Sequence, residues 1–211
     1  MDWEEYWEES EKRFWYNLIA TFYRKFVIKR NLNFYIRKYV KKSQLILHAG
    51  AGSGEVDKDI VRDYKIFALD ISKTAFIKNK TNKYKIRADL FSMPFKTESF
   101  HVVYNLGVLE HFHKQDIIKI LKEKRRILKK DGILIIFWPP EYGMSVCFFK
   151  LLRFLFRILG IKKIFHPAEP SRLKSRKEAE NIFEESGFML IEYYFGIRDL
   201  LTYAVLVGKR L

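Results

Sequence analysis

The chain has a single cysteine, Cys147, and only five prolines among its 211 residues. One cysteine cannot form an intramolecular disulfide, and no Cys/His cluster has zinc-site spacing, so we expect a cytoplasmic protein. No uncharged apolar run approaches the roughly 18 residues of a membrane span. Residues 1–5 carry acidic side chains where a secretory signal would carry basic ones. We therefore expect a protein that is neither exported nor integral to a membrane.

The sequence also lacks internal repeats and any Gly-, Ser- or Pro-rich run that would indicate a linker. With 48% hydrophobic and 31% charged residues, it has the composition of a globular protein. Its length favours one domain over residues 1–211. We divide this domain into a helical cap (1–43), a core (44–138), a basic insertion (139–174), and a last helix with closing strands (175–211).

Acidic residues are absent from 12–42, a segment that holds ten Lys and Arg, whereas residues 1–11 hold six acids and no base. Residues 144–177 hold nine Lys and Arg against one acid, Glu169, and the net charge is +15. Two interpretations remain open. The basic blocks face an anionic partner such as a membrane surface, a nucleic acid or an acidic substrate, or they only keep the surface soluble.

From residue 44 onward, short β-rich runs alternate with helical patterns, which is typical of a parallel sheet with crossover helices. The expected strands cover 44–48, 65–70, 84–88, 100–104 and 133–138, followed by an antiparallel pair at 188–195 and 200–207. Helices are expected at 55–62, after an N-cap at Ser72, through 117–128, and from Ser175 to Gly187. The first 40 residues are helical by pattern, with an apolar stripe of Trp15, Leu18, Ile19, Phe22 and Phe26 that covers either the substrate mouth or a sheet face.

A glycine loop follows the first expected strand and reads His48-Ala49-Gly50-Ala51-Gly52-Ser53-Gly54. Glycines between a strand and a helix allow backbone to approach a ligand without interference from Cβ atoms. The spacing lacks the third glycine of the dinucleotide pattern, because position 55 is Glu, and lacks the Gly-Lys-Ser/Thr ending of a phosphate-binding loop. The loop is therefore a ligand site of another kind or a tight turn.

Asp70 lies 20 residues after Gly50, at the carboxyl end of the second expected strand. There an acidic side chain can accept hydrogen bonds from both hydroxyls of a ribose. The alternative is an Asp that caps the helix beginning near Ser72.

Several motifs then follow in order: Ala88-Asp89-Leu90, Met93-Pro94-Phe95, Ser99-Phe100, and a segment from Tyr104 to His111-Phe112 that contains Val108-Leu109-Glu110. This series resembles the class I S-adenosylmethionine-dependent methyltransferase family, in particular its Val-Leu-Glu-His-Phe subgroup. The resemblance covers roughly residues 44–138, and the segments 129–132 and 180–188 are similar to the family as well. It implies a Rossmann-like α/β fold, with a mostly parallel seven-stranded sheet, helices on both faces and a C-terminal antiparallel hairpin.

The resemblance also implies S-adenosylmethionine as the cofactor. The three loop glycines would line its methionine moiety, Asp70 would hold the ribose, and Asn105 would lie beside the sulfonium through its backbone. Asp89 and Leu90 would contact the adenine, since a carboxylate accepts from an exocyclic amine and apolar side chains enclose a ring. The expected cofactor-binding set is His48, Ala49, Gly50, Gly52, Gly54, Asp70, Ile71, Asp89, Leu90 and Asn105.

Two positions depart from the family pattern. His48 stands where an acidic residue is usual, so the partner of the cofactor ammonium is either missing or a neutral imidazole. We therefore expect that His48→Asp leaves cofactor binding intact or tightens it. His101 replaces an Asp that often follows the Ser-Phe pair, with little expected effect.

His111 is the candidate catalytic residue, because it follows the fourth expected strand and imidazole titrates near neutral pH. A histidine that only orients or packs is the alternative. The Glu-x-x-Glu-His metal pattern of some quinone-ring methyltransferases has Gly107 at its first position, so no metal is predicted. A nucleic-acid substrate is less expected, because no Asn/Asp-Pro-Pro-aromatic segment follows the fourth strand and Cys147 lies elsewhere.

The basic insertion contains an amphipathic segment, 144–165, in which Lys150, Arg153 and Arg157 share one stripe and apolar residues cover most of the rest. Such a segment can lie in a membrane interface, cover the site as a lid, or form a dimer face. The expected function is thus methyl transfer to a small apolar or lipid-like acceptor, with peripheral contact at the inner membrane surface as an open possibility. The alternative is a cofactor-binding protein without transferase activity, whose basic surface binds RNA or a protein partner.

Overall fold

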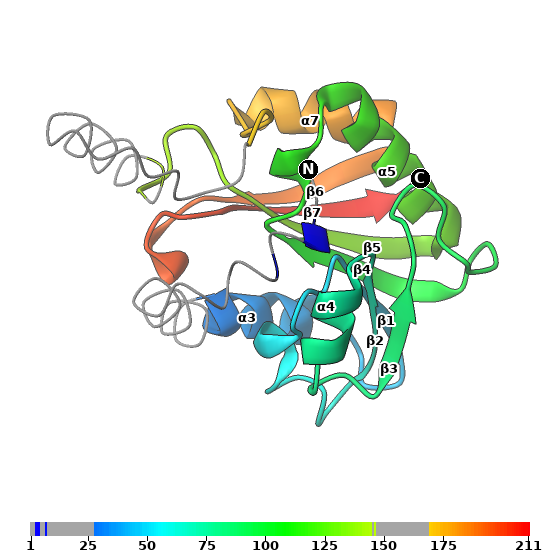
Figure 1. The fold of residues 1–211 in the computed structure, drawn as a ribbon. Helices are drawn as coiled ribbons and strands as arrows, with labels where there is room; N and C mark the ends of the chain where they lie inside the picture. Colours follow the sequence, from blue (N-terminus) through cyan, green and yellow to red (C-terminus); the bar gives the residue numbers. More distant parts are fainter. Residues whose placement is uncertain (1–2, 5–6, 8–27, 145, 147–168) are drawn as a thin grey trace, which may run out of the picture.

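The computed structural model describes residues 3–4, 7, 28–144, 146 and 169–211, and these form one seven-stranded sheet (Figure 1). The strands are β1 (Leu45–Ala49), β2 (Lys65–Asp70), β3 (Tyr84–Arg87), β4 (Phe100–Leu106), β5 (Leu128–Trp138), β6 (Phe188–Tyr194) and β7 (Ala204–Arg210). Their order is β3-β2-β1-β4-β5-β7-β6. Strand β7 runs antiparallel to both β5 and β6, and the other pairs are parallel. The predicted fold class is confirmed.

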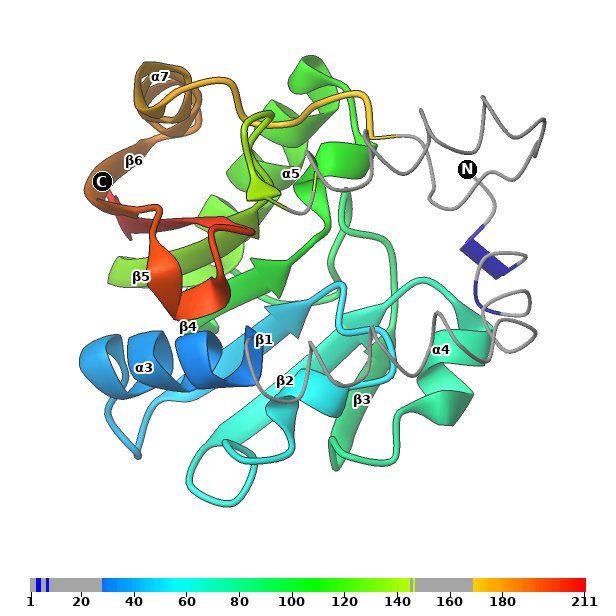
Figure 2. The same ribbon diagram turned by 90° about the vertical axis from the view of Figure 1, so that its left-hand side faces the viewer.

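Helices cover the two faces of the sheet (Figures 1 and 2). On one face, α3 (Lys29–Tyr39) packs Leu32, Tyr35 and Ile36 against side chains of the central strands. On the other, α5 (Lys114–Ile127) and α7 (Arg176–Glu185) bury their apolar stripes in a second core cluster. The short helix α4 (Lys73–Lys78) joins β2 to β3. Both cores converge on β1 and β4, which are therefore buried on both faces.

The described part of the N-terminal cap that forms a full helix, α3, covers a sheet face. The predicted stripe at 15–26 lies outside the described residues, as does most of the predicted amphipathic segment 144–165. Among the residues that the structure describes, no helix is long and apolar enough to cross a membrane.

One predicted helix is wrong. Residues 55–62 form the short 3-10 helix η2 (Glu55–Asp57) and a series of turns instead of a continuous α-helix. The Asp57 side chain is fully buried and bonded beneath the glycine loop, and the backbone bonds that follow it alternate between three- and four-residue spacing. The buried, hydrogen-bonded Asp57 side chain therefore interrupts the helix that the periodicity predicts.

Two strands also begin four or more residues from their predicted starts. Strand β5 begins at Leu128, five residues earlier, because Asp131 adopts a left-handed backbone (φ 59°) and the pairing with β4 continues across an irregularity. Strand β7 begins at Ala204 and not at residue 200, because Leu200 and Leu201 are both left-handed (φ 54° and 55°) and follow the 3-10 helix η4 (Ile197–Asp199). Left-handed residues other than glycine are uncommon, and no sequence pattern indicated them.

Candidate cofactor site

The candidate site lies where the order of the sheet reverses. Strand β1 lies between β2 and β4. After β1 the chain adds β2 and β3 on one side of it and then crosses over to add β4 and β5 on the other side. In open parallel sheets, ligands bind outside the carboxyl ends of the strands at such a switch point. The last registered pair between β1 and β4 is His48 with Tyr104, so Ala49 and Asn105 stand at the mouth of this crevice.

The glycine loop turns sharply as it leaves β1. Gly50, Gly52 and Gly54 all have positive φ, at 81°, 52° and 68°, a conformation that favours glycine. The N–H of Gly50 and the N–H of Ala51 both donate to the carbonyl of Leu69, at 2.8 and 2.9 Å. A Cβ on Gly50 would lie 2.7 Å from a methyl of Val108. The glycines are thus needed both for the turn and for the close approach of the loop to the chain after β4.

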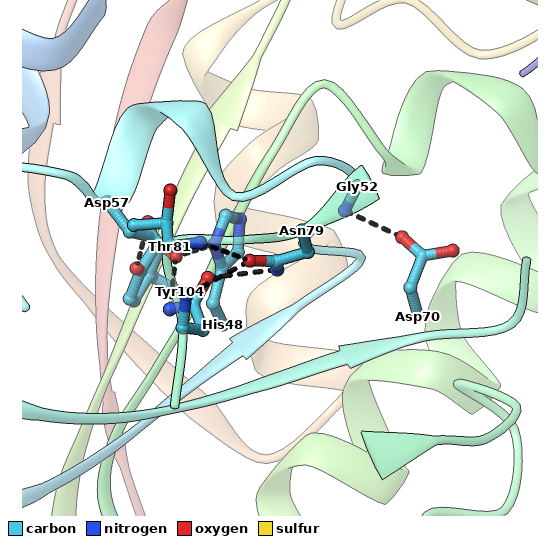
Figure 3. Close-up of polar contacts among 8 residues, drawn as sticks. His48, Gly52, Asp57, Asp70, Asn79, Thr81 and Tyr104 are labelled. Atoms are coloured by element: carbon cyan, nitrogen blue, oxygen red, sulfur yellow. Dashed lines mark hydrogen bonds and ion pairs between the residues drawn. The ribbon is translucent and has the colours of Figure 1, made fainter. Parts of the chain in front are cut away.

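Asp70 joins the glycine loop to the start of α4. Its carboxylate accepts from the N–H of Gly52 at 2.7 Å (Figure 3) and from the N–H of Ser72 at 3.0 Å. Burial raises the pKa of Asp70 from its ordinary value, although these two hydrogen bonds act in the opposite direction. Each carboxylate oxygen keeps a further lone pair. Asp70 therefore fixes the loop and the helix start and retains acceptor capacity at the sheet edge.

The predicted adenine residues lie next to Asp70. The N–H of Ala88 donates to the carbonyl of Asp70 at 3.1 Å, which holds the ends of β2 and β3 together. Ile71 is 45% exposed at this edge, Asp89 is exposed, and Leu90 packs partly against the core. Ile71 thus offers an exposed apolar side chain and Asp89 an exposed carboxylate, each just after the end of its strand, which are groups that can recognise an aminated ring.

His48 lies in a buried polar network behind the glycine loop. Its Nδ1 is 2.9 Å from Oδ2 of Asp57, and the Tyr104 hydroxyl donates to Oδ1 of the same carboxylate at 2.6 Å (Figure 3). Asn82 Nδ2 also donates to Oδ2, at 2.9 Å. The imidazole also stacks on the Tyr104 ring, with 4.3 Å between centroids. Asp57 is fully buried, so its carboxylate serves this internal network. An aspartate at position 48 would lie next to the Asp57 carboxylate, and the expected effect of His48→Asp on cofactor binding stays a prediction.

His111 ends the 3-10 helix η3 (Leu109–His111) after β4, at the mouth of the crevice. Trp3 meets its ring edge-on, with 5.1 Å between centroids and 82° between planes. Asn105 is fully buried, and its side-chain oxygen accepts from the ammonium of Lys124, which is also fully buried. Burial lowers the pKa of Lys124 to about 7. The Asn105 side-chain oxygen is thus engaged by Lys124, and the role of the Asn105 backbone stays a prediction.

Sequence reasoning missed Glu110, which is 4% exposed and next to His111. Burial, together with the charge of Glu169, raises its pKa to about 8. Its Oε2 has no hydrogen-bond partner among the described residues. The motif at 108–112 pointed to this position, whereas nothing in the sequence marked Asp57 or paired it with His48.

The chain is similar to known proteins in sequence and in fold. The sequence model of a methyltransferase domain family matches residues 47–136. Two uncharacterized proteins of Methanocaldococcus jannaschii are similar: MJ0638, 31% identical over 64% of this chain and 58% of that protein, and MJ1252, 30% identical over 76% and 67%. The chain thus spans less than two thirds of the first of these relatives.

Solved structures share the fold. A possible histamine N-methyltransferase of Thermotoga maritima, described as S-adenosylmethionine-dependent, has a TM-score of 0.67 at 20% identity, covering 99% of this chain and 98% of its own. Magnesium protoporphyrin IX methyltransferase of Synechocystis, with bound S-adenosylhomocysteine, has a TM-score of 0.66 at 14% identity, covering 87% and 82%. Residues 47–136 thus match a methyltransferase domain family, and the chain shares its fold with solved S-adenosylmethionine-dependent methyltransferases.

The solved neighbours are S-adenosylmethionine-dependent or hold S-adenosylhomocysteine, and the residues at the switch point suit such a cofactor. The glycine loop lies beside Asp70, which offers acceptors for hydroxyls, and Ile71 offers an apolar surface for a ring. Among the described residues, no group of three or more His, Cys, Asp and Glu side chains is arranged to hold a metal. The roles of the individual residues remain predictions.

Proposed function

We propose that this methyltransferase transfers the methyl group of S-adenosylmethionine to a small apolar or lipid-like acceptor. The observation that carries the proposal is Asp70 at the switch point, bonded to the N–H groups of Gly52 and Ser72. This geometry places an acceptor-rich carboxylate beside the glycine loop, where a ribose and an amino acid moiety can be held together.

When bound, the cofactor supplies an electrophilic methyl group on a sulfonium, and the protein mainly positions the two reactants. The glycine loop and Asp70 hold and orient the cofactor. His111, at the mouth, takes the proton of an acceptor that must lose one, or orients an acceptor that need not.

An apolar acceptor is supported by aromatic side chains in the loops that follow four strands, β3, β4, β5 and β6. Phe91, after β3, meets Phe112, after β4, with 5.6 Å between ring centroids. Tyr142, after β5, meets Phe195 at 5.0 Å, and its hydroxyl lies 2.6 Å from that of Tyr193. Phe91 is 39% exposed and Tyr142 is 46% exposed. Aromatic surface at the edge of the site favours an apolar partner over a highly charged one.

We further propose that the outer face of α3 contacts an anionic membrane. Arg30, Phe34 and Arg37 are exposed at three- and four-residue spacing, and they line a groove of about 560 Å³. Neither arginine has an acidic partner among the described residues, whereas Lys29 and Lys38 in the same groove are paired with Asp59 and Glu192.

Exposed apolar side chains at η4, beside this groove, favour a bilayer as the anionic partner. The guanidinium of Arg198 in η4 lies 3.9 Å from the centroid of the Phe34 ring, which joins η4 to α3. Ile197 and Leu200, on either side of η4, are 81% and 54% exposed. Exposed apolar side chains beside unpaired cations fit a headgroup region better than a nucleic acid.

The acceptor is tested by incubating the protein with S-adenosylmethionine and separate panels of lipids, quinones and RNAs, and by measuring S-adenosylhomocysteine. We expect product with a lipid or quinone, and less of it with His111→Ala. Product with RNA alone would contradict the proposed acceptor. Cofactor binding without product from any panel would favour the binding-protein alternative.

The membrane contact is tested by sedimentation with anionic vesicles at low and high salt. Each cation near the surface adds on the order of 1 kcal/mol, so Arg30→Gln with Arg37→Gln should weaken binding about tenfold or more. The matched control replaces Lys122 and Lys130, which are exposed elsewhere on the molecule, by Gln. Wild-type protein that stays in the supernatant at low salt contradicts the proposal.

A further inference from the structure

Three residues near the N-terminus, Trp3, Glu4 and Trp7, contact the candidate site from outside the sheet. We name them the N-terminal clasp. The short blue ribbon that carries them lies beside α4 in Figure 2. They contact three separate parts of the site: the first turn of α4, the glycine loop and His111.

Glu4 caps α4 although it is about 70 residues away in the sequence. Its carboxylate accepts from the N–H of Thr74 at 3.0 Å, from the N–H of Lys73, and from the hydroxyl of Ser72 at 3.1 Å. The N–H groups in the first turn of a helix have no partner within the helix, and a carboxylate there also meets the positive end of the helix dipole. These hydrogen bonds lower the pKa of Glu4 to about 2.

The remaining donors at this helix start are taken by residues of the site. The Ser72 N–H donates to Asp70, and the Ala75 N–H donates to the Ser72 hydroxyl at 3.0 Å. Glu4 therefore completes the same hydrogen-bond set that contains Asp70. Because Gly52 also donates to Asp70, the clasp, the helix start and the glycine loop are linked.

Trp7 lies directly on the glycine loop. A Cβ on Gly52 would be 2.7 Å from the Trp7 indole, so the ring occupies the space beside this glycine. The Trp7 carbonyl accepts from the ammonium of Lys78 at 2.8 Å, which ties the clasp to the far end of α4. Trp3 extends the contact to the His111 ring.

From these contacts we infer that the N-terminal clasp gates the cofactor site: Glu4 holds it shut on α4, and Trp7 must leave Gly52 before cofactor enters or leaves. The inference rests on the proposed cofactor site at the glycine loop. Glu4 acts as a positioning residue, since its bonds are to α4. Its loss should therefore speed both entry and exit, whereas loss of an ordinary cofactor contact speeds exit alone.

The test uses the full chain and S-adenosylhomocysteine as the probe, with stopped-flow tryptophan fluorescence for the rates and calorimetry for the affinity. Glu4→Gln should raise both the association and the dissociation rate constants about tenfold, because it removes charge-assisted hydrogen bonds. Glu180→Gln, an acidic residue of α7 paired with Arg176, is the matched control and should behave as wild type. Trp7→Phe should lose most of the fluorescence change while calorimetry still detects binding.

Unchanged rate constants in Glu4→Gln overturn the clasp and leave the cofactor site standing. A rise in the dissociation rate alone marks Glu4 as an ordinary contact and also overturns the gate. Wild-type protein that binds no S-adenosylhomocysteine rejects the cofactor site and the clasp together. Circular dichroism and urea unfolding of each variant show that the fold is intact.

Discussion

At the residue scale, His48 and Asp57 form a buried pair behind the glycine loop. Both side chains are almost completely buried, and Tyr104 and Asn82 complete the hydrogen bonding of the carboxylate. Buried polar groups of this kind stabilise only when every member keeps its partner. A substitution at position 48 is therefore felt by the whole network.

We expect His48→Asp to lower the free energy of unfolding by about 2–4 kcal/mol, because it places a second carboxylate against the buried Asp57 and removes the ring from Tyr104. His48→Gln, which keeps a donor and adds no charge, should cost less. Urea unfolding of the two variants and the wild type gives the comparison. A His48→Asp protein as stable as wild type, with tighter cofactor binding, would support the sequence-based interpretation.

Lys124 is a second residue whose burial changes its properties, in this case its pKa. Burial lowers its pKa to about 7, so the folded state disfavours the charged form and binds fewer protons than the unfolded state between about pH 7 and 10.5. The contribution of Lys124 to stability should therefore rise with pH across this window. Below pH 7 the cost of the buried ammonium is fully present.

Lys124→Met removes this pH dependence. The free energy of unfolding of the variant, relative to that of wild type, should be highest at pH 6.5. This difference should fall by on the order of a few kcal/mol by pH 10. Lys122→Met, an exposed position of the same helix, is the control. Urea unfolding at several pH values measures the difference, and a difference independent of pH would show that Lys124 is not titrated by folding.

The sequence could have revealed Lys124 but not Asp57. Lys124 follows Ile117 and Leu121 at helical spacing, so the apolar stripe of α5 already places it on the buried face. The pairing of His48 with Asp57 depends instead on how the loop after β1 turns, and that turn follows from left-handed glycines and contacts with distant residues. Glu4 at the start of α4 is equally non-local.

At the element scale, the serine N-caps of α4 and α7 depend on local chemistry and were predictable. Ser175 caps α7 by accepting from the N–H of Glu178 at 3.2 Å, and Glu178 reaches back to the N–H of Lys174 at 2.8 Å. This reciprocal pattern resembles a capping box. Ser72 caps α4 in the same way, as expected.

Replacing Ser175 by Ala should lower the free energy of unfolding by about 1 kcal/mol, because the Glu178 N–H loses its acceptor. Ser175→Asp supplies another acceptor and should stay close to wild type. Thermal or urea unfolding distinguishes the two. Equal losses in both variants would mean that the cap is not the source of the effect.

Elements whose boundaries depend on tertiary contacts were predicted less well. Strand β2 matches its expected range, because its buried residues and flanking turns are all local signals. The 55–62 segment and the start of β7 did not match, since a buried carboxylate interrupts one helix and two left-handed leucines delay one strand. Periodicity detects which face is apolar, and it does not detect a side chain anchored in the interior.

At the scale of the whole molecule, the alternation of strands and helices was sufficient to predict the sheet and its closing antiparallel pair. The position of the site then follows from topology, since the reversal of strand order between β2 and β4 brings residues 49–54, 70–71 and 105–111 to one edge. The acceptor does not follow from topology, because loop side chains determine it. These loops are where related folds differ most.

The central claim is that S-adenosylmethionine binds at the glycine loop with Asp70 as a principal acceptor. Calorimetric titration of the wild type, Asp70→Ala and Asp63→Ala with S-adenosylhomocysteine tests it most directly. Asp63, the control, is exposed, and its ion-pair partner in the part of the chain that the structure describes is Lys42. The account predicts saturable binding by the wild type and the control, and affinity lower by about 1–3 kcal/mol in Asp70→Ala. Equal affinity in Asp70→Ala and wild type would contradict the role of Asp70, and no binding by the wild type would contradict the cofactor site itself.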